Sequence, residues 1–244
     1  MLDNALLNGD WHPYSGAGFF ITPKEGGHLQ AHFQHSSQVA KCSPTNACEL
    51  TRCILEYRRQ IQIGWRFFKE YVPGFESAYI TKVCTELRLR EGPRIVGDYV
   101  LTRDDVGACR TFPDSIGKSS FKAGGHHVAS MDTLEVNVEN SPFVLPKGGG
   151  SYDIPYRSLV PQKIDNLLAG GKCVSTDRDA YLRYLQHTMA TGQAAGAAAA
   201  ICAENGVTPR AIEKDVSKLQ EALEKQGVIL YEVTQEVKTP VPFI

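Results

Sequence analysis

The spacing of hydrophobic residues changes along the chain, and each spacing predicts one type of element. Between residues 28 and 35, apolar and polar side chains alternate, which predicts a half-buried strand. From residue 49 to about residue 71, apolar side chains recur near helical spacing with arginines on the opposite face, which predicts an amphipathic helix. Val72-Pro73-Gly74 then ends this helix. Two strand-like pieces follow, over 78–89 and 94–102, before a loop-rich region.

A second pattern lies in the C-terminal third of the chain. Leu167-Leu168-Ala169 closes on Gly170-Gly171, which predicts a buried strand ending in a tight turn. A Gly/Ala run over 189–200 predicts a helix so slim that another backbone can lie against it. We expect this helix to begin near residues 191–193, where unpaired N–H groups and the positive end of the helix dipole would face an electron-rich group. A flavin pyrimidine ring, which gathers negative charge on reduction, suits that position.

The remaining C-terminal residues predict two further helices. Thr208-Pro209 is typical of a helix start, because proline is tolerated in the first turn. An amphipathic helix with Val216, Leu219 and Leu223 on one face follows and closes at Gly227. Residues 228–233 form a candidate terminal strand.

Composition narrows the class of protein. With 244 residues, of which 42% are hydrophobic, the chain can bury a core and form one large or two modest domains. The net charge of −1 gives no electrostatic basis for binding nucleic acid or an anionic membrane. No stretch reaches the roughly 20 apolar residues of a membrane helix, and the N-terminus lacks the pattern of a signal peptide. Seven scattered cysteines favour reduced thiols and a cytoplasmic protein.

Two groups of potential metal ligands require a decision between alternatives. His28, His32 and His35 would share one face of a helix, but the alternation around them predicts a strand, on which His35 points away from His32. A strand is therefore favoured first, surface histidines second and a metal site last. The spacing of Cys42, Cys48 and Cys53 matches no common zinc or iron–sulfur pattern, so small buried or loop thiols are favoured and no metal is predicted.

Several collinear motifs together resemble a known family. The run from Tyr152 to Arg210 contains Tyr-Asp-Ile-Pro-Tyr-Arg, Asn-Leu-Leu-Ala-Gly-Gly-Lys and Met-Ala-Thr-Gly-Gln-Ala-Ala-Gly. Upstream stand Tyr-Val-Pro-Gly-Phe-Glu-Ser from residue 71, Arg-Ile-Val-Gly-Asp-Tyr from residue 94 and Phe-Pro-Asp-Ser-Ile from residue 112. These motifs resemble the C-terminal part of bacterial FAD-dependent oxidoreductases related to the fumarate-reductase and succinate-dehydrogenase flavoproteins. The resemblance implies FAD as the cofactor.

One motif of that family is missing. Its members open with a strand, a Gly-x-Gly-x-x-Gly turn and a helix, and here only Ser15-Gly16-Ala17-Gly18 comes near this pattern. We therefore expect an α/β protein without the N-terminal dinucleotide-binding unit. Residues 1–150 would form an α+β cap or substrate domain, and residues 151–244 the C-terminal part of a Rossmann-like FAD-binding domain. A second polypeptide would supply the missing half, or the chain is a fragment.

The resemblance also implies catalytic residues. Chemistry at a flavin needs a positioned substrate, a proton donor or acceptor and usually a cation. Arg90 matches a basic run near the interface of the cap and flavin domains, and His127 stands about where the family carries a histidine, although the adjacent His126 leaves that assignment open. Tyr156 and Arg157 fall in a motif stiffened by proline and form the strongest pair for lining the site.

The same resemblance implies a set of cofactor contacts. Arg183 matches the arginine before the glycine–glutamine helix, where a cation near the flavin C2 carbonyl would stabilise the reduced anion. The segment around His187 departs from the family pattern, so His187 is either an addition to the site or a sign of relaxed selection. The predicted cofactor-binding residues are Gly170, Gly171, Arg183, Gly192, Gln193 and Ala194.

Three functions from different classes follow. The first is part or a subunit of an FAD-dependent oxidoreductase that transfers a hydride between a small polar organic substrate and the flavin. The second is a non-catalytic fragment or degenerate paralogue of such an enzyme, whose apolar faces would be left exposed. The third is a small-ligand binding module. The resemblance favours the first.

Overall fold

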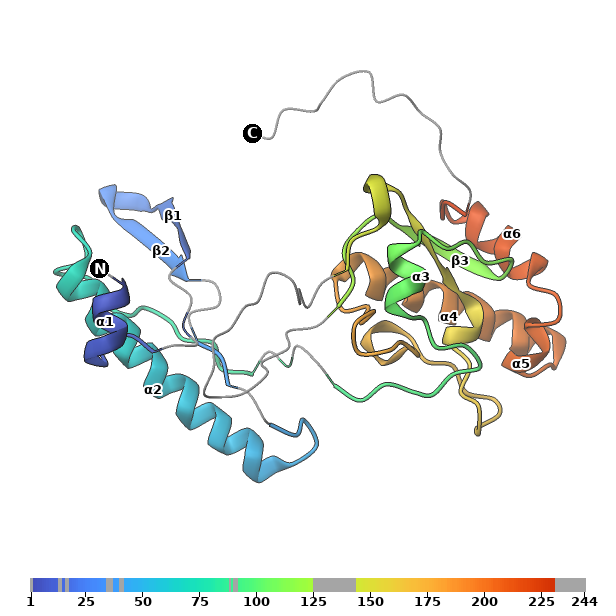
Figure 1. Cartoon of the computed structure of the whole chain (residues 1–244), viewed down its shortest axis with the longest axis horizontal. Helices are drawn as coiled ribbons and strands as arrows, with labels where there is room; N and C mark the ends of the chain where they lie inside the picture. Colours follow the sequence, from blue (N-terminus) through green and yellow to red (C-terminus); the bar gives the residue numbers. More distant parts are fainter. Residues whose placement is uncertain are drawn as a thin grey trace, which may run out of the picture. The chain divides into compact units, whose positions relative to one another are not determined.

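The structure is a computed structural model that describes residues 2–12, 15, 18–33, 37–39, 42–87, 89, 92–124 and 144–230. These residues divide into two compact units (Figure 1), which are described separately below. The N-terminal unit lies within residues 2–89, and the C-terminal unit within residues 92–230. The part of the chain that the structure describes contains no helix that is both long and apolar enough to cross a membrane.

The N-terminal unit is built from two helices and a hairpin. Helix α1 (Leu2–Asn8) precedes strands β1 (Phe19–Pro23) and β2 (Leu29–Phe33), and helix α2 (Ala47–Tyr71) follows them. The two strands pair antiparallel, with Phe19 opposite Phe33 and Pro23 opposite Leu29. The strand predicted over residues 28–35 is thus confirmed for residues 29–33. The predicted half-burial is wrong, because Leu29, on the face expected to be buried, is 70% exposed.

Helix α2 has clear chemical signals at both ends. The Asn46 side chain accepts the N–H groups of Cys48 and Glu49 at 3.0 and 3.2 Å, which caps the first turn. The helix ends at Tyr71, and the N–H of the following Val72 bonds to the Phe68 carbonyl. The amphipathic helix predicted from residue 49 to about 71 is therefore confirmed, with a start two residues earlier.

The core of the N-terminal unit is small and aromatic. Trp11 packs on Phe67 with ring centroids 4.7 Å apart and on Phe68 at 5.9 Å. Phe68 in turn meets Phe33 of the hairpin at 4.7 Å, so one turn of α2 joins the N-terminal residues to the sheet. The outer face of the hairpin, including Phe20, stays partly exposed.

The C-terminal unit combines a short sheet with four helices. Helix α3 (Arg103–Gly107) is followed by strands β3 (Ser115–Ser119) and β4 (Tyr152–Pro155), and then by helices α4 (Leu185–Asn205), α5 (Pro209–Ile212) and α6 (Ser217–Lys225). Strands β3 and β4 pair antiparallel with an irregular register between Ser115 and Lys118. Helix α4 packs against β3, α5 and α6, as Figure 1 shows.

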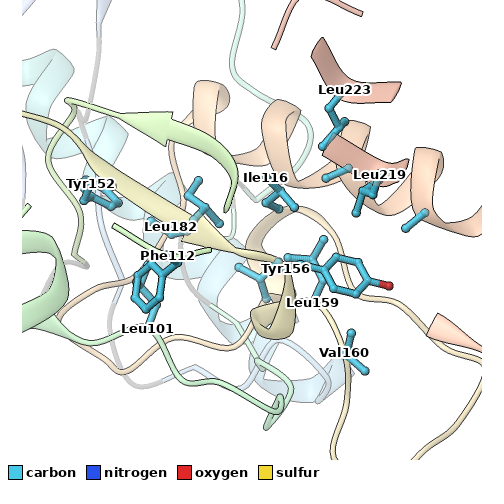
Figure 2. Packing of buried hydrophobic residues seen from close by; sticks show 14 of the residues in the cluster. Leu101, Phe112, Ile116, Tyr152, Tyr156, Leu159, Val160, Leu182, Leu219 and Leu223 are labelled. Atoms are coloured by element: carbon cyan, nitrogen blue, oxygen red, sulfur yellow. The ribbon is translucent and has the colours of Figure 1, made fainter. Parts of the chain in front are cut away.

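This unit encloses a continuous aliphatic and aromatic core (Figure 2), to which both strands and helices α4, α5 and α6 contribute. Burying one such side chain stabilises the fold by about 1.5–3 kcal/mol. Figure 2 labels Leu101, Phe112, Ile116, Tyr152, Tyr156, Leu159, Val160, Leu182, Leu219 and Leu223. The predicted helices after residue 208 are confirmed as α5 and α6. Residues 228–230 of the candidate terminal strand are not in a strand, and 231–233 lie outside the described residues.

Three predicted strands are wrong. No described residue of 78–89 lies in a strand, and 94–102 forms only isolated bridges, one from Gly97 to Pro161 and one from Leu101 to Thr176. Residues 167–169 belong to no strand, and Leu167 is 44% exposed. Apolar β-rich sequence becomes a strand only beside a partner strand, and the described residues place none next to these segments.

The mixture of helices and small sheets is compatible with an α/β class. Strands β3 and β4 lie on opposite sides of residue 150 and belong to one sheet, so the C-terminal unit includes residues of both predicted domains. The division at residue 150 concerned the roles of the two parts in cofactor and substrate binding. It stays a prediction.

Candidate functional site

The Gly170-Gly171 pair lies directly against helix α4. A Cβ atom added to Gly170 would stand 3.3 Å from the Cα of Gly192 and 3.6 Å from the Cβ of Ala195, so only glycine allows this approach without displacing the helix. The Gly171 N–H donates to Thr191 Oγ1 at 2.9 Å. The prediction of a helix slim enough for a second backbone is confirmed, and that backbone is a segment of the same chain.

Helix α4 begins earlier than the sequence predicted. Its first residue is Leu185, about two turns before the expected start at residues 191–193. The amides of 191–193 therefore lie inside the helix and bond to carbonyls of the preceding turn. The prediction that unpaired N–H groups at these positions would face a ligand is wrong.

One face of α4 is open along its length, and we refer to it as the open face of α4. Met189, 71% exposed, stands near its beginning, and a Cβ atom added to Gly192 or Gly196 would meet nothing within 4 Å. The open face consists of Leu185, Met189, Gly192, Gly196, Ala199 and Ala203. In its middle, the helix presents bare backbone rather than side chains.

An open groove of about 750 Å³ borders the C-terminal half of this face. Leu167 and Leu168 line it from the segment before Gly170, and Thr208 and Pro209 line it from the start of α5. The lining is mainly apolar and consists of Asn166, Leu167, Leu168, Ala195, Ala199, Cys202, Ala203, Gly206, Val207, Thr208 and Pro209. None of the six predicted cofactor-binding residues lines this groove, but Gly192 and Ala194 belong to the same helix, within one turn of Ala195.

The other predicted cofactor contacts have partners within the chain. Arg183 donates from Nε to the Gly124 carbonyl at 2.9 Å and from Nη2 to the Tyr184 hydroxyl at 3.2 Å. Gln193 is exposed and donates to the Gln226 side chain at 3.0 Å. Ala194 is fully buried in the core. The guanidinium of Arg183 is thus held by the Gly124 carbonyl and the Tyr184 hydroxyl, just before α4 in the sequence.

Tyr156 lies inside the core of the C-terminal unit. Its ring is fully buried (Figure 2), and its hydroxyl donates to the Pro209 carbonyl at 3.0 Å. Burial raises the pKa of this phenol, so the hydroxyl keeps its proton. In this arrangement Tyr156 joins the end of β4 to the start of α5, and its hydroxyl is already engaged.

Arg157, next to it, forms a two-pronged ion pair. Its Nε and Nη2 donate to the two carboxylate oxygens of Asp114 at 2.9 and 3.1 Å, and its backbone N–H donates to the same carboxylate. The guanidinium also lies 5.2 Å from the centre of the Tyr99 ring. The hydrogen bonds that Arg157 donates to the Asp114 carboxylate raise the pKa of Arg157 further above its ordinary value. Asp114 precedes β3 and Arg157 follows β4, so this pair closes one end of the sheet.

Two of the predicted catalytic residues, Arg90 and His127, lie outside the described residues, as does the alternative His126. Their roles remain predictions. Arg94 is described, and its guanidinium lies 4.9 Å from the centre of the Tyr181 ring. In the hairpin, His32 contacts Thr22 through its Nε2 at 2.8 Å and stacks on Phe20, while His35 is outside the described residues.

The structure also reveals a buried polar cluster that the sequence did not assign. His187 Nε2 lies 2.8 Å from Ser119 Oγ and 3.0 Å from the Tyr152 hydroxyl, which joins α4 to both strands of the sheet. The other ring nitrogen, Nδ1, is buried without a hydrogen-bond partner. Burial lowers the pKa of His187 to about 4, so the imidazole is neutral at pH 7. The only sequence signal was that this segment departs from the family pattern.

A family comparison decides the class of protein. The family model described as FAD dependent oxidoreductase matches residues 10–223, which spans both units. The chain therefore belongs to the FAD-dependent oxidoreductase family, and this membership implies FAD as its cofactor. No curated protein and no solved structure gives a significant match.

Proposed function

We propose that this chain forms the substrate-side and flavin-contacting part of an FAD-dependent oxidoreductase related to fumarate reductase and succinate dehydrogenase flavoproteins. In this proposal, the enzyme transfers a hydride between a small polar organic substrate and the flavin. A further polypeptide segment with a strand–Gly-x-Gly-x-x-Gly–helix unit holds the dinucleotide, since the sequence of this chain contains no such motif.

The observation that carries the proposal is the bare backbone on the open face of α4. Gly192 and Gly196 leave open space where a side chain would stand. A planar aromatic ring can therefore approach the helix backbone closely there, as a flavin requires and as larger residues would prevent. Thr191 and Gly170 hold the adjoining loop against the helix, which fixes the position of Gly171 beside this surface. The residues fit the flavin in shape.

FAD supplies the chemistry of hydride acceptance and donation when it is bound. The chain's own contribution is a rigid apolar support that excludes water from one side of the ring system. A cation that orients a polar substrate is expected from the predicted set of arginines. Arg183 stands before α4 with its guanidinium held by Gly124, so it is already oriented without the cofactor.

The exposed segment before Gly170 supports the proposal of a further polypeptide segment that binds the dinucleotide. Ile164 and Leu167 are 55% and 44% exposed, and the sequence from 167 to 169 has the character of a buried strand. We propose that the dinucleotide-binding half packs on this segment and covers its exposed apolar side chains.

The test compares two leucine substitutions on the same helix. The full chain is incubated with FAD and with a candidate dinucleotide-binding polypeptide, passed over a size-exclusion column, and the retained flavin is measured by its visible absorption. Gly192→Leu should reduce the retained flavin at least tenfold, because the leucine side chain occupies the space above the backbone.

Gln186→Leu is the matched control, since Gln186 is exposed on α4 and points about 100° around the helix from Leu185, away from the open face. It should retain flavin like the unmodified chain. Equal retention by both variants would contradict the proposed cofactor surface. Absence of flavin from the unmodified chain under every condition would instead favour a non-catalytic paralogue.

A further inference from the structure

The segment before α2 is described over residues 37–39 and 42–46, and it is attached to the helix at two separate points. The Ser43 N–H donates to the Glu49 carboxylate at 2.6 Å, near the start of the helix. Further along, the Gln60 side chain donates to the Gln38 carbonyl and accepts the Gln38 N–H, both at 2.9 Å. Gln38 bonds to Gln60, whereas the later residue Ser43 bonds to the earlier residue Glu49. The segment and the helix therefore run antiparallel.

Two cysteines meet between these two points. Cys53 is four residues after Glu49 and seven before Gln60, so all three share one face of α2. Cys42 precedes Ser43 and lies close enough to the Cys53 thiol to contribute to its raised pKa. The Cys42 thiol donates towards the Ser43 carbonyl at 3.8 Å.

The two thiols differ in accessibility. Cys53 is 2% exposed, whereas Cys42 is half-buried and within reach of solvent. Burial, together with the contact to Cys42, raises the pKa of the Cys53 thiol to about 11. Both residues are reduced in the structure. Among the described residues, no third histidine, cysteine, aspartate or glutamate joins them in a group able to hold a metal ion.

We propose that Cys42 and Cys53 form a reversible disulfide that cross-links the segment before α2 to the helix in response to low-molecular-weight disulfides. The two attachments that bracket Cys42 and Cys53 support this inference, because a disulfide needs the two residues already close together. The hydrogen bonds on either side, from Ser43 to Glu49 and from Gln38 to Gln60, keep the segment in that position.

The reaction proceeds by two thiol–disulfide exchanges. The Cys42 thiolate attacks one sulfur of the small disulfide, forms a mixed disulfide and releases one small thiolate, which takes up a proton. The Cys53 thiolate then attacks the Cys42 sulfur, closes the protein disulfide and releases the second small thiol. The protein loses two hydrogen atoms, and the small disulfide is reduced to two thiols. An excess of small thiol reverses both steps.

The order of the two steps follows from burial. A small disulfide reaches Cys42 but not the buried Cys53, so Cys42 reacts first. The second step is intramolecular and needs the Cys53 thiolate. Its rate should therefore rise about tenfold for each pH unit below the raised pKa of Cys53.

The experiment uses the full reduced chain, incubated with glutathione disulfide, alkylated and digested with trypsin without reduction. Trypsin cleaves after Lys41, Arg52 and Arg58, which places Cys42 and Cys48 in one peptide and Cys53 in the next. A disulfide-linked pair of peptides 42–52 and 53–58 is expected, and it should disappear when glutathione is added. Because either cysteine of the first peptide could form that link, the Cys48→Ser variant identifies which one does.

Three variants make the outcome decisive. Cys48→Ser should form the linked peptides as the unmodified chain does. Cys53→Ser, with Cys53→Ala as a second choice if the serine disturbs packing, should stop at a glutathione adduct on Cys42. Cys42→Ser should form no link and leave Cys53 unmodified. Far-UV circular dichroism checks that each variant is folded.

Two results would overturn the inference. One is an unmodified chain that keeps all its thiols in glutathione disulfide. The other is loss of the link in Cys48→Ser, which would assign the bridge to Cys48. Neither result depends on flavin binding, so this test is independent of the proposed function.

Discussion

The two units of this protein are stabilised in different ways. The N-terminal unit relies on one long helix. A few aromatic side chains pack at one end of this helix, and hydrogen bonds attach the segment before α2 to its side. The C-terminal unit has a much larger core. It also contains a buried ion pair and the buried polar cluster around His187. The first unit buries few side chains and can open at one attachment at a time, whereas the second depends on one continuous core. The surface we assign to the flavin lies in the second.

The largest effect is expected from an ion pair in the C-terminal unit. The Lys118 ammonium lies 2.6 Å from the Asp153 carboxylate, and both side chains are almost completely buried. Asp153 also accepts the Phe112 N–H at 2.9 Å. Asp153→Ala leaves a buried cation and a buried N–H unpaired, so it should lower the free energy of unfolding by about 3–5 kcal/mol.

Denaturant unfolding measures this loss, and hydrogen exchange should locate it in the peptides of β3 and β4. The control is Asp165→Ala, because Asp165 is 79% exposed and lies 3.7 Å from Arg210. Its effect should stay below about 1 kcal/mol. A comparable loss in both variants would contradict the difference between buried and exposed pairs.

The second effect concerns pH. The pKa of His187 is about 4 in the folded state and about 6.5 when unfolded, so the unfolded state binds the extra proton first. Stability is therefore expected to fall as the pH drops from about 6.5 towards 4, by roughly 3 kcal/mol in total. His187→Gln should flatten this dependence when melting temperatures are measured across the range.

His12 provides the comparison between units, because burial lowers its pKa as well. His12→Gln should alter the acid sensitivity of exchange in the N-terminal unit, and His187→Gln that in the C-terminal unit. If His187→Gln leaves the pH dependence unchanged, the neutral buried imidazole is not responsible for it.

The smallest effect is expected at the fastening of the segment before α2. Gln60 is 1% exposed and makes two hydrogen bonds to the Gln38 backbone. Gln60→Ala should cost about 1–2 kcal/mol and should speed exchange in peptides covering residues 37–39. Gln62→Ala, an exposed position of the same helix, should leave these peptides unchanged. Neither variant should change hydrogen exchange in the C-terminal unit, because both positions lie in the N-terminal unit.

The sequence predicted the elements that local chemistry determines. Helix α2 has a side-chain cap at Asn46 and a regular apolar face, and β2 alternates cleanly. Helix α4 was placed too late because its N-cap, Tyr184, makes no side-chain capping bond that would mark the start. The segment 167–169 was assigned to a strand because apolar composition reports burial in a sheet but not the presence of a partner strand.

The candidate site was only partly predictable for a similar reason. The Gly/Ala composition correctly indicated a close backbone approach to α4. The sequence did not reveal that Arg157 pairs with Asp114 or that His187 meets Ser119, because these partners are 43 and 68 residues apart in the chain. An arginine or a histidine can be assigned a role in substrate binding only after its hydrogen-bond and ion-pair partners within the protein are known.

The most direct test of the account is the visible absorption spectrum of the full chain with FAD and a dinucleotide-binding partner, taken before and after anaerobic addition of a reductant. The account predicts that flavin bands remain with the protein after gel filtration, bleach on reduction and return in air. Flavin that separates completely from the protein, with or without the partner, would contradict the claim that this member of the family works as a flavoenzyme.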